Sequence, residues 1–335
     1  MRTISMLTVA VPFVLVLAGR AAAAESDAPT LLSVRRIWDR APHNAFTDLV
    51  RFRDRWYCAF REGKAHASPD GALRVIRSED GRSWESAARL TYPKADARDA
   101  KLSVTPDGRL MLSGAAALHQ PAAARHQSLA WFSDTGDTFG EAHAIGRPDD
   151  WMWSAAWHKG VAYSIGYRTV DPRSTRLYHS RDGRTWEVLV DRLFTDGYPN
   201  ETSLVFAADD TACCLLRRDG TKRTAQLGTA KPPYKDWTWK DLGVQIGGPK
   251  MIQLPDGRLL AAVRLYRPTR TSLCWVDPEK ARLTECLKLP SGGDTSYAGL
   301  VLHDGTLRVS YYSSHERKTS IYLAAVRIPG KEELD

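Results

Sequence analysis

The sequence predicts an all-β protein that folds as a six-bladed β-propeller. Two repeats carry this prediction. The first is a polar turn followed by an aromatic residue, which occurs three times, and the second is a pair of apolar segments joined by a tight turn, which occurs six times. A period of roughly 50 residues fits a propeller blade of four strands. Two stacked β-sandwiches are the alternative, but they do not explain a constant period.

The polar turn has the pattern Ser-x-(Asp/Thr)-Gly-x-(Ser/Thr)-aromatic and occurs at residues 78–85, 133–140 and 180–187. The copies start 55 and 47 residues apart. We expect each copy to connect the third and fourth strands of one of the first three blades. The aromatic residues then anchor the turns and carry no chemistry; they are Trp84, Phe139 and Trp186.

The paired apolar segments flank turns at residues 54, 107, 159, 209, 256 and 304, which lie 47 to 53 residues apart. At 107, 256 and 304 the turn is Asp-Gly. Asp-Gly between apolar segments is a strong hairpin signal, because a tight two-residue turn needs residues that tolerate positive φ. Six near-equal intervals therefore predict six blades, each starting with such a hairpin.

The N-terminus has the pattern of a secretory signal peptide. It begins Met1-Arg2, continues with an apolar run over residues 7–17 and ends in four alanines at 21–24. The apolar run is too short to span a membrane, and Arg20 stands where a lipoprotein would need a cysteine. We expect residues 1–24 to be removed and residues 25–335 to form a single exported domain, secreted or periplasmic, without stable membrane insertion.

Charge and cysteine content restrict the partners. The net charge of +8 favours an anionic ligand, but the arginines do not cluster with aromatic residues along one helix, so no nucleic-acid partner is expected. Five cysteines cannot all pair within one chain, although Cys274 and Cys286 could face each other across a hairpin. The sequence shows no Cys/His zinc spacing and no nucleotide or phosphate motif, so no metal or cofactor is expected.

In a propeller, the start of the first strand and the end of the second strand of each blade open onto the same face. Nearly every blade places a charged or phenolic side chain at these positions. Among them are Arg61, Arg98 and Asp99, Tyr167, Glu201 and Arg217, Lys250 and Arg264, and Tyr297 and Tyr312, with Trp153 at the same face of blade three and Asp70 on the loop that follows Arg61. This concentration of polar groups beside apolar runs predicts a site for an anionic ligand.

With its period and its polar turns, the chain resembles the sialidase superfamily, whose members are six-bladed propellers with Ser-x-Asp-x-Gly-x-x-Trp boxes. Glu201 and Arg217, one hairpin apart, look like the family's glutamate and the arginine that follows it. Arg264 matches the next arginine, and Tyr297 looks like the family's nucleophilic tyrosine. The resemblance implies an exo-glycosidase that hydrolyses a terminal anionic sugar, either sialic acid or a related 2-keto-3-deoxy acid.

This chemistry has a physical reason. Sialic acids carry a carboxylate on the anomeric carbon, which repels a carboxylate nucleophile, whereas a neutral tyrosine avoids that repulsion. Glu201 would take the phenol proton of Tyr297. Arginines bind a carboxylate through two parallel hydrogen bonds, so we expect substrate contacts from Arg61, Arg98, Arg217, Arg264 and Tyr312. Arg217 and Arg218 alternate in direction, and Arg217 is expected to point inward.

The resemblance has two departures. Residues 43–49 read His-Asn-Ala-Phe-Thr-Asp-Leu, without the arginine that the family has at the start of blade one; Arg61 or Arg98 could replace it. The general acid is expected at Asp70, with His66 and Asp99 as alternatives. The alternative functions are a glycosidase for another acidic sugar and a non-catalytic sugar-binding propeller. A pairing of Glu201 with Tyr297 favours an enzyme, because a lectin needs no activated phenol.

Overall fold

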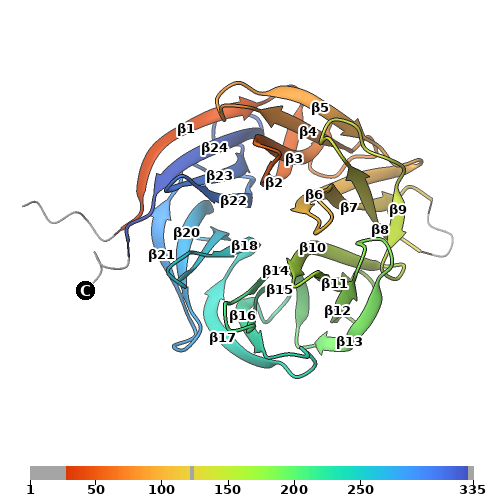
Figure 1. Cartoon of the computed structure of the whole chain (residues 1–335), viewed down its shortest axis with the longest axis vertical. Coiled ribbons are helices and arrows are strands. Elements are labelled where there is room, and N and C mark those ends of the chain that lie inside the picture. Colours follow the sequence, from red (N-terminus) through yellow and green to blue (C-terminus); the bar gives the residue numbers. More distant parts are fainter. Residues whose placement is uncertain (1–27, 121–123, 331–335) are drawn as a thin grey trace, which may run out of the picture.

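Six four-stranded antiparallel sheets surround a central axis in the computed structural model, which describes residues 28–120 and 124–330 (Figure 1). The first strands of neighbouring sheets contact one another around the axis, and the later strands follow outward to the rim. The described part of the chain contains strands and turns only, so no helix in it could cross a membrane. The all-β, six-bladed propeller is therefore confirmed, whereas the expected signal peptide lies outside the described residues.

Five blades are continuous in sequence. Blade one comprises β2 (His43–Phe52), β3 (Arg55–Gly63), β4 (Ala72–Ser78) and β5 (Glu85–Leu90). Blade two comprises β6 (Ala95–Val104), β7 (Leu110–Leu118), β8 (His126–Ser133) and β9 (His143–Ile145). Blade three comprises β10 (Asp150–His158), β11 (Val161–Arg168), β12 (Thr175–Ser180) and β13 (Glu187–Phe194). Blade four comprises β14 (Tyr198–Phe206), β15 (Ala212–Asp219), β16 (Thr224–Ala230) and β17 (Thr238–Gln245). Blade five comprises β18 (Gly247–Gln253), β19 (Leu259–Leu265), β20 (Arg270–Asp277) and β21 (Arg282–Lys288).

Blade six closes the ring with strands from both ends of the chain. It comprises β22 (Thr295–His303), β23 (Thr306–Ser313) and β24 (Ser320–Arg327), with β1 (Thr30–Trp38) as its outer strand. β1 pairs antiparallel with β24, from Thr30 opposite Arg327 to Trp38 opposite Ile321. Because this ladder joins the two ends, opening the ring requires breaking a complete strand pairing.

The predicted turns lie where the repeats placed them. All six connect the first and second strands of a blade. Positive φ angles occur in each of them, for example 60° at Asp54, 48° at Lys159 and 47° at Asp304. Such angles are unfavourable for most residues with a side chain, so Asp and Gly are selected at these turns.

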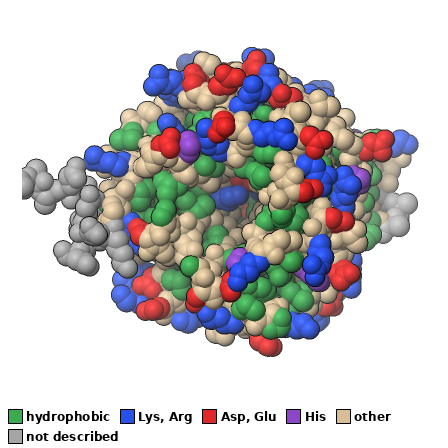
Figure 2. Space-filling model, in the orientation of Figure 1, with side chains coloured by type: hydrophobic (Ala, Val, Ile, Leu, Met, Phe, Trp, Pro, Cys, Tyr) green, Lys and Arg blue, Asp and Glu red, His purple; other side chains and the backbone are tan. Residues whose placement is uncertain are grey.

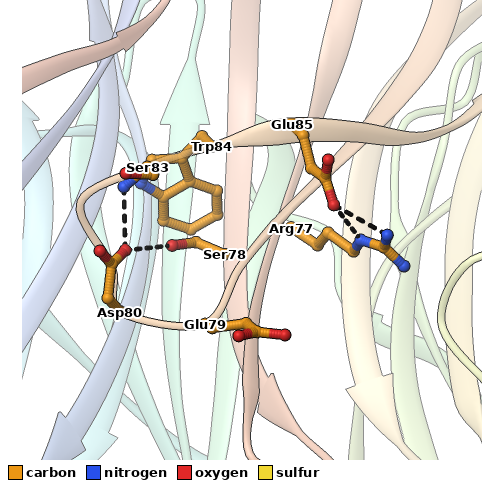
Figure 3. A pocket seen from close by; sticks show the side chains of 7 residues that line it. All are labelled: Arg77, Ser78, Glu79, Asp80, Ser83, Trp84 and Glu85. Carbon is orange, nitrogen blue, oxygen red and sulfur yellow. Dashed lines mark hydrogen bonds and ion pairs between the residues drawn. The ribbon is translucent and has the colours of Figure 1, made fainter.

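The three polar boxes connect the third and fourth strands of blades one to three, as predicted. In the first box, one carboxylate oxygen of Asp80 accepts hydrogen bonds from the Ser83 amide at 2.9 Å and from the Ser78 hydroxyl at 3.0 Å (Figure 3). The Gly81 amide in turn donates to the Ser78 hydroxyl at 2.9 Å. The backbone polar groups of the turn are satisfied locally, which leaves Trp84 to pack against the blade.

The cysteines do not form the bridge considered from the sequence. Cys274 lies opposite Glu285 in the β20–β21 ladder, and the thiol of Cys286 contacts the carbonyl of Leu273 at 3.3 Å. All five cysteines are described and all are free. The hairpin register is one residue away from the one that a Cys274–Cys286 disulfide would need, so this possible pairing is not formed.

Candidate active site

A pocket of about 270 Å³ lies where the first halves of the inner strands meet. Side chains from blades one, two, three, four and six line it: Phe46, His66, Arg98, Asp99, Ala117, His126, Trp151, Tyr167, Glu201 and Tyr297. In the view of Figure 2 the middle of the ring is hollowed, and Lys or Arg side chains show within the hollow. Inner-strand starts and second-strand ends thus share one face, which is the placement expected from the sequence.

A bulge interrupts every inner strand at the same height. The strand register shifts between residues 45 and 48, 98 and 101, 152 and 155, 199 and 202, 247 and 250, and 296 and 299. The unpaired residues of these bulges include Phe46, Asp99, Glu201, Gly248 and Tyr297. A bulge redirects side chains, and here it directs them to the axis of the propeller.

Three side chains on these bulges have strained backbones. φ is 64° at Phe46, 56° at Asp99 and 51° at Tyr297. Such a conformation costs of order 1–3 kcal/mol for a residue that is not glycine, and it concentrates at functional sites. All three line the pocket, so the strained backbone positions coincide with the candidate site.

The centre of the site is a hydrogen-bonded pair from blades four and six. The Tyr297 hydroxyl donates to Oε1 of Glu201 at 2.5 Å. Nη1 of Arg217 donates to the same Glu201 oxygen at 2.7 Å and to the Tyr297 hydroxyl at 3.1 Å. The Gly248 amide donates to Oε2 of Glu201 at 2.8 Å. Glu201 is therefore held at both oxygens.

Gly248 is required for this arrangement. Its φ is 54°, and a Cβ atom added here would lie 2.8 Å from the Tyr297 ring and 2.9 Å from the Tyr297 amide. Only glycine lets the backbone of blade five come close enough to reach Glu201 beneath the tyrosine.

The protonation states suit a proton transfer from Tyr297 to Glu201. Burial and the Glu201 charge raise the pKa of Tyr297 well above 10. Burial also raises the pKa of Glu201. The charge and hydrogen bond of Arg217, and the hydrogen bonds from Tyr297 and Gly248, lower the pKa by more than burial raises it, so the net shift is downward. At neutral pH the pair is a phenol beside a carboxylate, which can act as a base towards it.

Arg264 and Tyr312 lie next to the pair. Nε of Arg264 donates to the Thr295 carbonyl at 2.7 Å, and Nη2 donates to the Tyr312 hydroxyl at 2.9 Å. The guanidinium lies 5.3 Å from the centre of the Tyr297 ring. Tyr312 is fully buried and donates to Asp294 at 2.7 Å, so its hydroxyl positions Arg264 and does not line the pocket.

The opposite wall carries Arg98 and Asp99. The Arg98 guanidinium lies 5.2 Å from the centre of the Phe46 ring and 3.3 Å from Asp96. Asp99 is only 7% exposed, and no described residue hydrogen-bonds to its carboxyl group or forms an ion pair with it. Burial raises the pKa of Asp99, although Arg98 and Lys101 oppose the shift. A buried carboxyl without a partner is costly, and this one faces the pocket.

Five residues expected at the site are not on the pocket wall: Arg217, Arg264 and Tyr312 lie beside Tyr297, whereas Arg61 and Asp70 have other surroundings. Arg61 is fully buried, with Nε 2.7 Å from Asp96 and Nη1 2.8 Å from the Ala65 carbonyl, so it holds the loop after β3. Asp70 is exposed on that loop and accepts a hydrogen bond from the Lys64 amide at 3.2 Å. The position of Arg61 near the end of a second strand suggested a substrate contact, and the family resemblance suggested Asp70 as the acid. In the structure, Arg61 forms a buried ion pair and Asp70 shapes a loop.

The adjacent arginines point in different directions. Arg217 faces Glu201 and Tyr297, whereas Arg218 is bonded to Asp196 at 2.9 Å and Asp241 at 2.6 Å near the rim of blade four. Sequence reasoning missed Phe46 and His126 in the pocket and Asp294 beside it. Aromatic residues within strands and aspartates just before strands are common in sequences, so these residues cannot be recognised as site residues without knowledge of the bulges.

Comparison with known proteins identifies the fold. No family model matches the chain, and no curated protein matches it in sequence. A crystal structure of a protein of unknown function from Dyadobacter fermentans superposes with a TM-score of 0.80 at 19% identity, over 90% of this chain and all of that one. Trypanosoma rangeli sialidase in complex with the inhibitor DANA superposes with a TM-score of 0.67 at 13% identity, over 88% of this chain and 56% of that one.

A third solved structure widens the range of relatives by fold. Penicillium chrysogenum alpha-L-arabinanase, complexed with arabinobiose, superposes with a TM-score of 0.68 at 14% identity, over 88% of this chain and 98% of that one. All three superpositions extend over most of this chain at under 20% identity, so the likeness concerns the fold. The chain is therefore a six-bladed β-propeller of the sialidase-like fold.

Proposed function

We propose that the protein is an exported exo-glycosidase of the sialidase type, which hydrolyses a terminal anionic sugar. The observation that carries the proposal is the 2.5 Å hydrogen bond from Tyr297 to Glu201 at the wall of the pocket. A phenol held against an ionised carboxylate is an activated nucleophile. The two sugar hydrolases among the structures of similar fold, the T. rangeli sialidase and the P. chrysogenum arabinanase, support a glycosidase in general.

The proposed reaction has two displacements. In the first, Glu201 accepts the phenol proton as the Tyr297 oxygen bonds to the anomeric carbon, and an acid gives its proton to the departing glycosidic oxygen. In the second, the conjugate base of that acid takes a proton from water, whose oxygen replaces Tyr297 at the anomeric carbon. Tyr297 then recovers its proton from Glu201. The sequence of steps is that of a retaining glycosidase with a tyrosine nucleophile.

Asp99 is the acid that we assign to this reaction. It lines the pocket with Tyr297 and Glu201, is free of partners among the described residues, and has a raised pKa because it is buried. A general acid needs these properties, since it must hold its proton until the leaving group takes it. Asp70 has none of them, because it is exposed and its pKa is lowered by the hydroxyl of Ser68.

The positive charge around the pocket supports an anionic substrate. Arg98 lies on the wall, Arg217 and Arg264 lie beside Tyr297, and Lys101 Nζ lies 4.8 Å from the centre of the Trp153 ring. Nη1 of Arg264 has no hydrogen-bond partner among the described residues. We propose Arg98 and Arg264 as the groups that bind the substrate carboxylate, with Arg217 holding the nucleophile and its base.

The test is hydrolysis of fluorogenic glycosides by the mature protein, with N-acetylneuraminic acid, a 2-keto-3-deoxy acid and a uronic acid as the sugars. Release from the sialoside supports the hypothesis that the protein is a sialidase. Release only from another acid keeps the nucleophile and changes the assigned substrate. No release from any of them, together with binding to a glycan array, would replace the enzyme by a sugar-binding propeller.

A further inference from the structure

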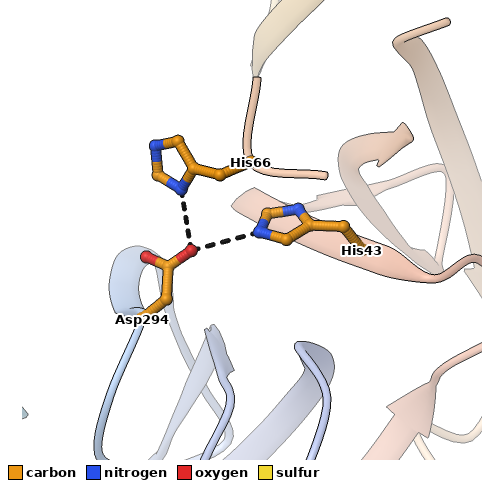
Figure 4. Close-up of side chains that lie close together, drawn as sticks. All are labelled: His43, His66 and Asp294. Carbon is orange, nitrogen blue, oxygen red and sulfur yellow. Dashed lines mark hydrogen bonds and ion pairs between the residues drawn. The ribbon is translucent and has the colours of Figure 1, made fainter. Parts of the chain in front are cut away.

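Three side chains that are far apart in sequence meet beside the pocket. His43 lies at the start of β2, His66 lies on the loop after β3, and Asp294 directly precedes β22. Both imidazoles point to the same carboxylate oxygen of Asp294 (Figure 4). Nε2 of His43 lies 3.1 Å from it and Nδ1 of His66 lies 2.7 Å from it. These atoms all lie within 4.8 Å of one another, and the described residues contain no second such group.

The three groups form a donor set that suits a divalent transition-metal ion. Two imidazole nitrogens and one carboxylate oxygen are a common set for Zn²⁺ with an open fourth position. With bonds of about 2.0–2.2 Å, the ligand atoms of a tetrahedral zinc ion lie roughly 3.3 Å apart. The two nitrogen–oxygen distances of 3.1 and 2.7 Å are close to this spacing. An ion could enter after only small movements of the side chains.

The surroundings hold the ligands in place. The other oxygen of Asp294 accepts a hydrogen bond from Tyr312 at 2.7 Å, which fixes the carboxylate in the way that outer hydrogen bonds fix metal ligands. His43 is 9% exposed, and its ring packs against Phe46 and Tyr312. His66 is 53% exposed at its side chain and packs edge-on against Phe46. Two ligands are thus rigid, while the third lies on an accessible loop.

The charge balance also permits a cation. Asp294 supplies the one carboxylate of the set, and one of its oxygens faces both histidine rings. Arg264 lies 3.5 Å from Oδ1 of Asp294, the oxygen that faces away from the histidines. Its charge opposes a cation at Oδ2 less than it would at Oδ1, because the repulsion falls with distance.

We propose that His43, His66 and Asp294 bind Zn²⁺ or a similar divalent transition-metal ion, with a free position directed into the pocket. His66 lines the pocket together with Glu201 and Tyr297. The free position would therefore take an anionic ligand such as a carboxylate, a consequence that rests on the proposed function. His43 begins the segment at which the sialidase resemblance lacks its first arginine, and the ion would supply positive charge there.

The first experiment measures metal binding without any substrate. The folded mature protein is stripped with a chelator, dialysed and titrated with ZnCl₂ by calorimetry. We expect one ion per chain with a Kd in the micromolar range or lower. Substitution His66→Ala, and the double substitution His43→Ala/His66→Ala, should each weaken binding by at least about tenfold. The exposed His66 makes the single variant safe for folding, which a thermal melt verifies.

The matched control is His126→Ala. His126 also lines the pocket but is not part of the cluster, so this variant should bind Zn²⁺ like the parent protein. Titration with Co²⁺ tests the ligand type. Visible d–d bands without a thiolate charge-transfer band are expected, because the cysteines are not ligands. Absence of one-to-one binding, an unchanged affinity in the double variant, or a thiolate band would overturn the site.

A second titration separates the metal site from the proposed function. N-acetylneuraminic acid is titrated into zinc-loaded and zinc-free protein, and the loaded form should bind it more tightly. Equal affinity would refute the role in carboxylate binding. If zinc binds but no glycoside is hydrolysed, the metal site stands and the proposed function fails. If glycosides are hydrolysed and zinc does not bind, the proposed function stands and the metal site fails.

Discussion

The hydroxyl of Tyr297 donates a 2.5 Å hydrogen bond to Oε1 of Glu201, although the two residues are 96 positions apart and lie on blades six and four. Blade five lies between them and contributes the Gly248 amide, which holds the second carboxylate oxygen at 2.8 Å. Arg217 contacts both partners. The pair therefore depends on three consecutive blades and on a bulge in each of their inner strands.

Replacing Tyr297 by Phe should abolish turnover with little effect on folding. The change removes the nucleophilic oxygen but keeps the ring that packs against Phe46 and Trp153. We expect kcat to fall by at least about 10³-fold, and the free energy of unfolding to change by about 1 kcal/mol from the lost hydrogen bond. Tyr163→Phe, at the boundary of blades three and four, is the control and should retain activity. Comparable losses of stability and activity would place Tyr297 in the packing alone.

Asp99→Asn and Asp70→Asn should separate the two candidate acids. The buried Asp99 faces the pocket and Asp70 is exposed on a loop. Asp99→Asn should slow hydrolysis of substrates with a poor leaving group by about 10²-fold or more, and slow activated aryl glycosides much less, because these need little protonation. Asp70→Asn should behave like the parent protein. Steady-state kinetics on both kinds of substrate show which residue is the acid. A larger loss in Asp70→Asn than in Asp99→Asn would reassign the acid to Asp70.

The pH profile of kcat/KM should be bell-shaped. Its acid limb reflects protonation of Glu201, which can then no longer accept the phenol proton. Although burial raises the pKa of Glu201, Arg217 holds it below its usual 4.5, so activity should persist into mildly acidic solution. The alkaline limb reflects loss of the Asp99 proton, at a pKa that burial raises above 3.8. In Asp99→Asn, measured with an activated substrate, that limb should be absent; an unchanged limb would assign it to another group.

Arg98→Gln should weaken binding of the anionic sugar more than it slows the chemical step. Its guanidinium lies on the pocket wall, and a charge-assisted hydrogen bond contributes about 1.5–3 kcal/mol. KM should therefore rise by about tenfold or more with a small change in kcat. Arg109→Gln is a suitable control, because Arg109 contacts Asp107 in a tight turn and is not on the pocket wall. A fall in kcat at constant KM would contradict a binding role.

The polar box of blade one should stabilise the fold in a pH-dependent way. Hydrogen bonds from the Ser83 and Arg82 amides lower the pKa of Asp80 from 3.8 to about 2. A depressed pKa contributes stability that is present above 3.8 and is lost as the pH falls towards 2. Asp80→Ala should lower Tm near neutral pH, and this difference should shrink on acidification. Glu79→Ala, in the same turn, should cause a smaller shift in Tm. If Asp80→Ala lowers Tm equally at every pH, the ionised Asp80 carboxylate is not the source of the stability.

The sequence determined the fold because its information is periodic and local. Tight turns recur near every fiftieth residue, and three of them are Asp-Gly. Polar boxes in blades one to three satisfy their own backbone through short-range hydrogen bonds, for example between Asp80 and Ser83. Strand alternation could also separate Arg217 from Arg218, since neighbours in a strand point to opposite faces. Glu201 and Tyr297 stood out because both start inner strands and match one known pattern.

Only the tertiary structure decided which polar residues meet. Arg61 occupies a position near the end of a second strand like that of Arg217, yet it forms a buried pair with Asp96. Asp70, the expected acid, lies on an exposed loop. The bulges that aim Asp99 and Tyr297 inward leave no mark in the alternation of apolar residues. His43, His66 and Asp294 converge only because the ring closes β22 against β2. Contacts between blades depend on ring closure and on local backbone strain, and neither can be predicted from the spacing of residues along the chain.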